Sequence, residues 1–212
     1  MERLTIQVGG FEVNCSILND NGKAWIVDPG QEAERIIDAL AKKGLEPAAV
    51  LLTHAHFDHI GAIPGLLKRF PDLPVYVHEK DAPMFGHPLN QLPPEYPNTG
   101  SLKGLRGLRG LRSVEGLEVE IIETPGHTPG GVCYYFPNFR TSQTAKPLNL
   151  LLSGDTLFAG SVGRTDLPGG DMATLMDSLR KLTALPDDTL VIPGHGPHTT
   201  IADEKRGNPF LQ

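Results

Sequence analysis

The chain has 212 residues, of which 39% are hydrophobic and 21% charged, a composition typical of a globular protein rather than a disordered one. Its formal net charge at pH 7 is −6, and no basic stripe is present, which argues against nucleic acid as a dedicated partner because phosphate contacts need clustered cations. No run approaches the roughly 18 apolar residues of a membrane span, and residues 1–5 contain no apolar core of a secretory signal. We therefore expect one domain over residues 1–212, in the cytoplasm and without a membrane anchor.

The N-terminal third alternates strand and helix patterns. Apolar runs at 13–18 and 24–27 flank residues 19–22, which end in Asn-Gly, and this pair between apolar runs predicts a hairpin. A helix is expected over 31–43, where apolar residues recur at helical spacing and Gly44 follows as a stop. Further along, the pattern predicts a buried strand over 50–52, a helix over 60–70 with Pro64 in its first turn, and a strand over 75–77.

Regular patterns are weak between residues 83 and 112. Five prolines between 83 and 97 interrupt any regular element, and residues 102–112 then repeat a Leu-basic-Gly triplet. A period of three matches neither a helix nor a strand, so we predict an irregular surface loop. It is either a solvated connector, which we favour, or a basic loop that recruits substrate.

The C-terminal half again shows apolar strand runs. Asp171 is a suitable N-cap for a helix that extends to about residue 185. Since the strand runs form two blocks that are each followed by helices, we predict an α+β fold with two packed sheets and helices outside. The strands are expected over 117–122, 132–136, 148–152 and 189–192.

Residues 53–59, Thr-His-Ala-His-Phe-Asp-His, are the most informative stretch of the sequence. An apolar run at 48–52 leads directly into it, so a buried strand ends by placing three imidazoles and one carboxylate close together. Imidazole and carboxylate are ligands that suit Zn²⁺, Fe or Mn. This stretch therefore predicts a catalytic metal site.

Three further donors follow the same rule, because each comes after an apolar strand and directly after a glycine. If the strands share one orientation, their ends meet at one edge. Seven donors exceed the needs of one ion and suit two ions that share a bridging carboxylate, for which Asp155 is the natural choice. No Cys is among them, so a closed structural zinc site is not expected, and Cys15 and Cys133 are predicted to be buried thiols. The seven donors are His54, His56, Asp58, His59, His127, Asp155 and His195.

The motif at 53–59, together with the three downstream donors, resembles that of the metallo-β-lactamase superfamily. The resemblance extends over the whole chain and implies a four-layer αββα sandwich. It also implies that Asp28 braces the His-rich loop, although a plain Asp-Pro-Gly turn is an alternative. By the same resemblance, His54, His56 and His127 hold a first metal, Asp58, His59 and His195 hold a second, and Asp155 bridges them.

Within the superfamily, several segments resemble the glyoxalase II branch, which comprises the hydroxyacylglutathione hydrolases, and in particular its short bacterial members. By the same resemblance, a bridging Asp155 and the expected lack of an export signal would set the chain apart from true β-lactamases. Long glyoxalase II enzymes have a further C-terminal helical region that binds glutathione, and the residues after His195 are too few for it. The resemblance rests on residues 161–166, Gly169-Gly170-Asp171, 194–197 and 208–211.

The resemblance implies hydrolysis of a small-molecule thioester, with an S-2-hydroxyacylglutathione such as S-lactoylglutathione as the substrate. Two divalent ions, Zn²⁺ or else Fe or Mn, would activate a hydroxide as the nucleophile, and Asp58 would orient the attacking water or accept its proton. The sequence does not indicate an oligomeric state.

Two other functions remain open. Persulfide dioxygenases also resemble this chain, and they use one iron, which His54, His127 and Asp155 would hold here. A non-catalytic metal-binding module is the third hypothesis, which the glycine-rich loops disfavour because structural sites are usually closed.

Arg164 is the one candidate for substrate binding, although we favour a structural role in which it fixes its loop through Asp166. The remaining histidines, His78, His87 and His198, are expected at the surface.

Overall fold

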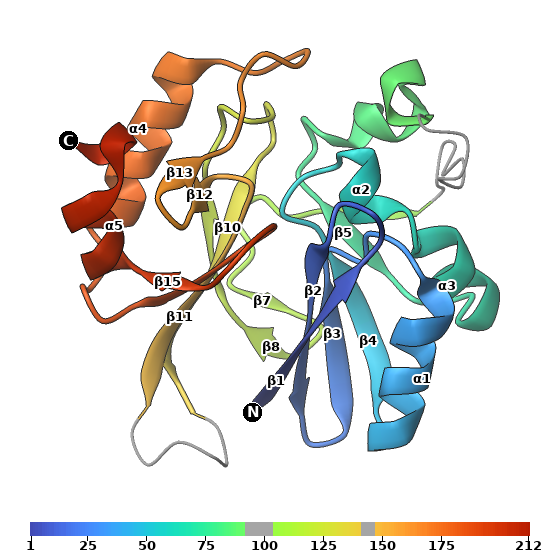
Figure 1. Cartoon of the computed structure of the whole chain (residues 1–212). Helices are drawn as coiled ribbons and strands as arrows, with labels where there is room; N and C mark the ends of the chain where they lie inside the picture. Colours follow the sequence, from blue (N-terminus) through green and yellow to red (C-terminus); the bar gives the residue numbers. More distant parts are fainter. Residues whose placement is uncertain (92–103, 141–146) are drawn as a thin grey trace.

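The computed structural model describes residues 1–91, 104–140 and 147–212 and consists of two β-sheets packed face to face (Figure 1). The first sheet has the strand order β1-β2-β3-β4-β5-β6, antiparallel from β1 to β3 and parallel from β3 to β6. The predicted hairpin is confirmed, because Asn21 and Gly22 have φ of 49° and 82° and connect β2 to β3. The strands are β1 (Glu2–Val8), β2 (Val13–Asp20), β3 (Lys23–Val27), β4 (Glu46–Leu51), β5 (Val75–Val77) and β6 (Leu105–Gly107).

The second sheet has the order β15-β14-β11-β10-β9. Strand β10 is antiparallel to both β9 and β11, and β11 is parallel to β14, so β9, β11 and β14 run in the same direction. Two short hairpins, β7–β8 and β12–β13, lie beside the sheets. The strands are β7 (Ser113–Val114), β8 (Leu117–Glu118), β9 (Glu120–Glu123), β10 (Val132–Phe139), β11 (Leu148–Gly154), β12 (Leu157–Phe158), β13 (Ser161–Val162), β14 (Leu190–Pro193) and β15 (Thr199–Thr200).

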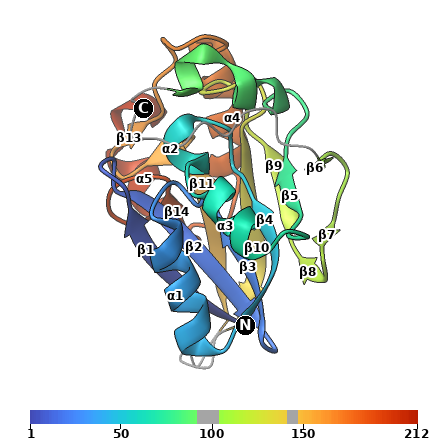
Figure 2. The same ribbon diagram turned by 90° about the vertical axis from the view of Figure 1, so that its right-hand side faces the viewer.

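Helices cover the outer face of each sheet (Figure 1). Figure 2 shows α1, α2 and α3 in front of the first sheet, while α4 and α5 cover the second. Helix α1 ends at Gly44 in the left-handed conformation, and α4 begins at Asp171, whose carboxylate accepts a hydrogen bond from the Thr174 N–H, as predicted. The helices are α1 (Ala33–Lys43), α2 (Phe57–Ile60), α3 (Ile63–Arg69), α4 (Met172–Thr183) and α5 (Ile201–Gly207), with 3₁₀ turns η1 (Ala82–Gly86), η2 (Pro88–Gln91) and η3 (Pro209–Leu211).

Three apolar layers hold these four structural layers together. Alternation along β11 illustrates how one strand serves two of them: Leu150 and Leu152 pack between the sheets, while Leu151 packs against α4. A third layer lies between the first sheet and its helices, where Ile36 and Leu66 are fully buried. The predicted αββα order is therefore present in the packing.

Two hydrogen bonds join the sheets where β4 ends. The buried Tyr134 hydroxyl of β10 donates to the Leu52 carbonyl over 2.7 Å, and the Val132 N–H donates to the Thr53 carbonyl over 2.8 Å. Both acceptors lie just before the first His of the His-rich loop. The second sheet therefore fixes the position from which that loop starts.

The expectation of an irregular loop over 102–112 is wrong in part. Leu105–Gly107 forms β6, an edge strand parallel to β5, and Leu108 is fully buried between the sheets. The triplet did not predict this strand because β6 is only three residues long, none of them is fully buried, and its pairing with β5 supplies its hydrogen bonds. Residues 102 and 103, and the prolines at 93, 94 and 97, lie outside the described residues.

Two predicted elements are each divided in the structure. The helix expected over 60–70 is preceded by a separate turn of helix, α2, and begins at Ile63 with Pro64 in its first turn. The strand expected over 117–122 is broken at Val119 into β8 and β9. No helix in the described part of the chain has the length and apolar character needed to cross a bilayer.

Replacing Tyr134 by Phe should destabilise the protein by about 1–3 kcal/mol, because the buried Leu52 carbonyl loses its hydroxyl donor. Urea unfolding of the variant and of the parent measures this difference. Tyr76→Phe is the control, since its hydroxyl donates to the half-exposed Glu115 and its loss should cost less. Equal stability of Tyr134→Phe and the parent would contradict the role given to this bond.

Candidate metal centre

All seven predicted donors converge beyond the ends of β4, β9, β11 and β14. Three of these strands run in the same direction within the second sheet, as the prediction required. The loops that follow the four strands therefore open at one edge of the sandwich. Side chains up to 141 positions apart in the sequence, such as His54 and His195, contribute to one cluster.

One group of donors consists of His54, His56 and His127, whose ring nitrogens lie within 4.8 Å of one another. His56 Nδ1 is 2.9 Å from His127 Nε2, and all three side chains are buried. The two imidazoles of the His-rich loop thus meet an imidazole from the loop after β9. We call this set the first group.

Asp58, His59 and His195 form the second group, again with ligand atoms within 4.8 Å. His195 Nε2 lies 3.3 Å from Asp58 Oδ2 and 3.2 Å from His59 Nε2. This group therefore combines α2 with the loop after β14.

Asp155 lies between the two groups. Its Oδ2 is 3.6 Å from His127 Nε2 and 3.5 Å from His195 Nε2, and its Oδ1 is 3.3 Å from His59 Nε2. One carboxylate thus faces both sets, which is the position that a bridging ligand requires.

Three of the imidazoles contact another group of the protein through the nitrogen that points away from the cluster. His127 Nδ1 donates to the Arg164 carbonyl over 2.6 Å, and His195 Nδ1 donates to the Phe11 carbonyl over 2.8 Å. His59 Nδ1 lies 3.1 Å from Asp28 Oδ2. Such contacts orient the rings and leave Nε2 as the nitrogen that faces the cluster, an arrangement common to metal-binding histidines.

Asp28 braces the His-rich loop as the resemblance implied. Its buried carboxylate accepts hydrogen bonds from the Thr53 N–H over 2.8 Å and the Thr53 hydroxyl over 2.7 Å, in addition to its contact with His59. The same turn supplies Gly30, where a Cβ atom would lie 1.9 Å from the Asp58 carbonyl oxygen. Only glycine allows the turn to approach α2 this closely.

Buried atoms that make no hydrogen bond within the described part of the chain indicate what the cluster is built to hold. His54 Nε2 and Asp155 Oδ1 both belong to this class. An unpaired buried polar atom is costly, so such atoms in a cleft call for a ligand. Nitrogen and oxygen donors in two groups with a shared carboxylate fit a pair of divalent ions.

The electrostatics of the cluster agree with this fit. Burial and the neighbouring His59 lower the pKa of His54 well below its usual value, and burial together with His127 lowers the pKa of His56 to about 4. Burial alone would raise the pKa of Asp155, but His59, His127 and His195 lower it. Neutral imidazole and ionised carboxylate are the protonation states that bind metals.

The pKa of His59 shifts in the opposite direction from those of His54 and His56. Burial on its own would lower its pKa, but Asp155, Asp58 and Asp28 raise it well above the usual value. Three carboxylates around one imidazole thus attract a positive charge, and a divalent cation would supply that charge in place of the proton.

The cluster opens into a cavity of about 520 Å³ whose mouth is largely apolar. Phe11, with 52% of its surface exposed, packs edge-to-face on Phe57 at a centroid distance of 5.6 Å. Leu167 and Pro168 line the same cavity. The metal donors therefore form the polar floor of an apolar cleft, a common design for small-molecule sites.

Arg164 also lines this cavity, but its guanidinium forms two hydrogen bonds, of 2.7 and 2.6 Å, with Asp166. The structure thus shows the ion pair on which the favoured structural role was based, while the Arg164 carbonyl orients His127.

Two polar residues near the cluster were not identified from the sequence, namely Asp81 and Asn90. Both contact the peptide of Ala55, between His54 and His56, and neither has a local sequence pattern that indicates this. The expectation of a surface position is wrong for His78, which follows β5 directly and is buried, with Nε2 3.7 Å from Glu123 Oε1. His87 and His198 are exposed, as expected.

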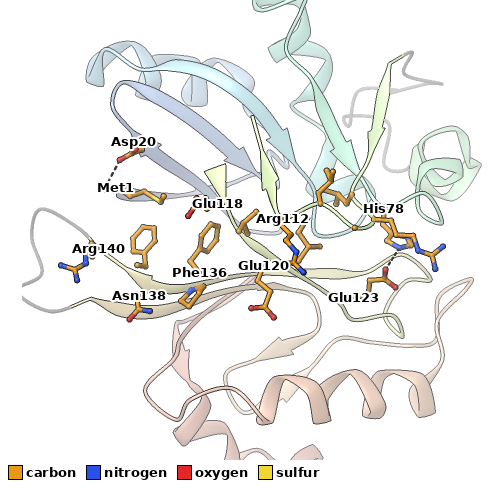
Figure 3. Close-up of a pocket in the computed structure, with 18 residues that line it drawn as sticks. Met1, Asp20, His78, Arg112, Glu118, Glu120, Glu123, Phe136, Asn138 and Arg140 are labelled. Carbon is orange, nitrogen blue, oxygen red and sulfur yellow. Dashed lines mark ion pairs between the residues drawn. The ribbon is translucent and has the colours of Figure 1, made fainter. Parts of the chain in front are cut away.

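A larger cavity of about 960 Å³ lies along the open edge between the sheets (Figure 3). Its wall has charges of both signs, with the Met1 amino group paired with Asp20 at one end and His78 facing Glu123 at the other. None of the potential metal-binding groups found among the described residues lies in it. The smaller cavity is therefore the candidate active site.

Comparison with known proteins identifies the family. The family model described as "Metallo-beta-lactamase superfamily" matches residues 8–195. The probable metallo-hydrolase YqgX of Bacillus subtilis is 39% identical, over 96% of this chain and 94% of its own. The hydroxyacylglutathione hydrolase GloC of Haemophilus influenzae is also 39% identical, over 97% of this chain and 96% of its own.

Solved structures give the same result. BLEG-1, described as a B3 metallo-β-lactamase, superposes with a TM-score of 0.86 at 38% identity and full coverage of both chains, so the likeness extends to a protein of the β-lactamase class. TTHA1623 in a di-iron-bound form gives 0.86 at 38% identity, over 98% of this chain and 100% of that one. ETHE1 from Myxococcus xanthus gives 0.76 at 27%, over 99% and 84%. With its fold, its donors and these relatives in agreement, the chain belongs to the metallo-β-lactamase superfamily.

Proposed function

We propose that this protein is a hydrolase with two divalent metal ions that cleaves a thioester, with an S-2-hydroxyacylglutathione such as S-lactoylglutathione as the substrate. The observation that carries the proposal is the position of Asp155 between two groups of three donors. A relative of 39% identity described as a hydroxyacylglutathione hydrolase supports the choice of substrate.

The proposed roles of the residues follow from their positions. The first group, His54, His56 and His127, would hold one ion, the second group the other, and Asp155 both. When bound, such ions supply an activated water and polarise the substrate carbonyl. We propose zinc, with iron or manganese as alternatives that the same donors suit.

Asp58 is the proposed proton acceptor. Burial on its own would raise the pKa of its carboxyl, but His59 and His195 lower it, so the group is ionised at neutral pH. Its side chain lines the cavity beside His195, within reach of a water on the floor of the cleft. An ionised carboxylate at that place can orient the water and accept its proton.

A mononuclear iron dioxygenase that acts on a persulfide is the second candidate. His127 Nε2 and Asp155 Oδ2 are 3.6 Å apart, close enough to share one ion with His54. TTHA1623, at 38% identity, is described in a di-iron-bound form, which supports iron as a metal for such donors although it holds two ions rather than one.

Purified protein should release thiol from S-lactoylglutathione and contain two metal ions per chain, as measured by a thiol assay and by elemental analysis. Oxygen uptake with glutathione persulfide is recorded in parallel. One iron per chain, with oxygen uptake and no thioester cleavage, would replace the hydrolase with the dioxygenase.

His54→Ala should weaken metal binding at least about tenfold, because the variant loses a ligand whose Nε2 has no other partner in the described structure. Elemental analysis after dialysis against a chelator measures the retained metal. His198→Ala, at an exposed histidine outside the cluster, is the control and should keep the parent's metal content. A His54→Ala variant with full metal content and full activity would contradict the proposed centre.

Phe11→Ala should lower kcat/KM about fivefold, mainly through KM, since removal of a half-exposed ring from the mouth costs about 1 kcal/mol of substrate contact. Metal content should not change, because the carbonyl that orients His195 belongs to the backbone. Steady-state kinetics and elemental analysis test both statements, with the exposed Phe210→Ala as the control. Unchanged kcat/KM would show that the aromatic mouth does not contact substrate.

A further inference from the structure

Asp81 is a fully buried carboxylate that none of the metal-donor groups includes. It lies on the segment between β5 and η1, four residues after the end of β5. A buried carboxylate is costly unless hydrogen bonds compensate its charge. Three hydrogen-bond donors provide that compensation for Asp81.

The three donors come from two loops that are far apart in the sequence. Asp81 Oδ2 accepts from the Ala55 N–H over 3.2 Å and from the Thr128 hydroxyl over 2.8 Å, and Oδ1 accepts from the Gly130 N–H over 2.6 Å. Ala55 separates His54 from His56, while Thr128 follows His127. A single carboxylate therefore joins the two loops that supply the first group.

The groups around Asp81 leave its carboxylate little room to move. A Cβ atom at position 130 would lie 2.7 Å from Asp81 Oδ1, so the loop approaches the carboxylate as closely as glycine permits. In the His-rich loop, Asp81 accepts from the Ala55 N–H, and Asn90 Nδ2 donates to the Ala55 carbonyl. The residue between the two imidazoles is thus held at both its N–H and its C=O.

Asp81 and Asp28 differ in the groups that they support. Asp28 reaches both groups, because it contacts His59 and also Thr53, whose hydroxyl lies 3.1 Å from His54 Nδ1. The three hydrogen bonds of Asp81 end beside members of the first group only.

We propose that Asp81 is a positioning residue that sets the geometry of His54, His56 and His127 and thereby the affinity of the first group for its metal ion. The inference rests on the proposed metal centre but not on the proposed reaction. Partners of this kind around metal ligands typically contribute a factor of 10–100 in metal affinity.

Asp81→Asn is the main test. Because both carboxylate oxygens accept from N–H or O–H groups, the amide NH₂ faces a donor whichever way it turns. Protein labelled with ¹⁵N at histidine is titrated with Zn²⁺ in a chelator buffer, and imidazole ¹H–¹⁵N spectra report each ring separately. Rings of the first group should need about tenfold or more free Zn²⁺ to reach their bound positions, while His59 and His195 saturate as in the parent.

A second pair of variants tests the proposal even if Asp81→Asn does not fold. Thr128→Val removes one hydrogen bond to Asp81 at nearly constant shape, and Thr128→Ser retains it. Valine should weaken zinc binding at the first group, and serine should restore it. Glu204→Gln is the matched control for Asp81→Asn, because Glu204, on α5, is also a buried carboxylate that accepts three hydrogen bonds. Its donors are the Gly160 N–H, Asn208 Nδ2 and the Thr199 hydroxyl.

Equal losses at both groups in Asp81→Asn, or in Thr128→Val should the first variant not fold, would overturn the proposal and assign Asp81 a general role in stability. Unchanged zinc affinity at the first group would overturn it as well. If the parent itself bound no zinc at these rings, the proposed metal centre would fail, an outcome distinct from failure of the role given to Asp81.

Discussion

The common direction of β9, β11 and β14, with β4 ending beside them in the facing sheet, is the constraint on which the rest of the structure depends. These strands pack against the opposite sheet and the helix layer, with β11 and β14 largely buried and β9 partly buried. Because parallel strands end at the same edge, the loops after them share one space. Donors separated by most of the chain thus meet without any one loop being long.

A cluster of this kind has an electrostatic cost that the protein meets in two ways. The outward-facing Nδ1 atoms of His127 and His195 donate to backbone carbonyls, and that of His59 faces the carboxylate of Asp28, so these three rings are oriented by neutral groups and by a single carboxylate. Some inward-facing atoms have no such partner: His54 Nε2 and Asp155 Oδ1 make no hydrogen bond in the described structure. The contacts around the rings therefore fix their orientation, while the atoms that face the interior of the cluster remain available to bind cations.

The sequence was sufficient to predict that these seven side chains come together, because each of the four segments that carry them follows an apolar run that ends in a turn. Asp171 as a helix cap and Asn21-Gly22 as a hairpin turn were predictable for the same reason. Asp81 was not, because its three partners lie at positions 55, 128 and 130 and become neighbours only in the fold. The strand β6 was missed because the Leu-basic-Gly repeat has neither strand nor helical periodicity and does not show which leucine is buried; Leu108, just after the strand, packs between the sheets.

Each donor group draws on both sheets, and this has a thermodynamic consequence. An ion at the first group would join the loop after β4 to the loop after β9, and one at the second would join α2 to the loop after β14. Ligand that binds only the folded chain raises the free energy of unfolding, by about 2.7 kcal/mol per site at a free concentration 100 times the Kd. The free-ion level of the surroundings would then set the fraction of the chain that is folded, so that metal supply would control the amount of folded protein.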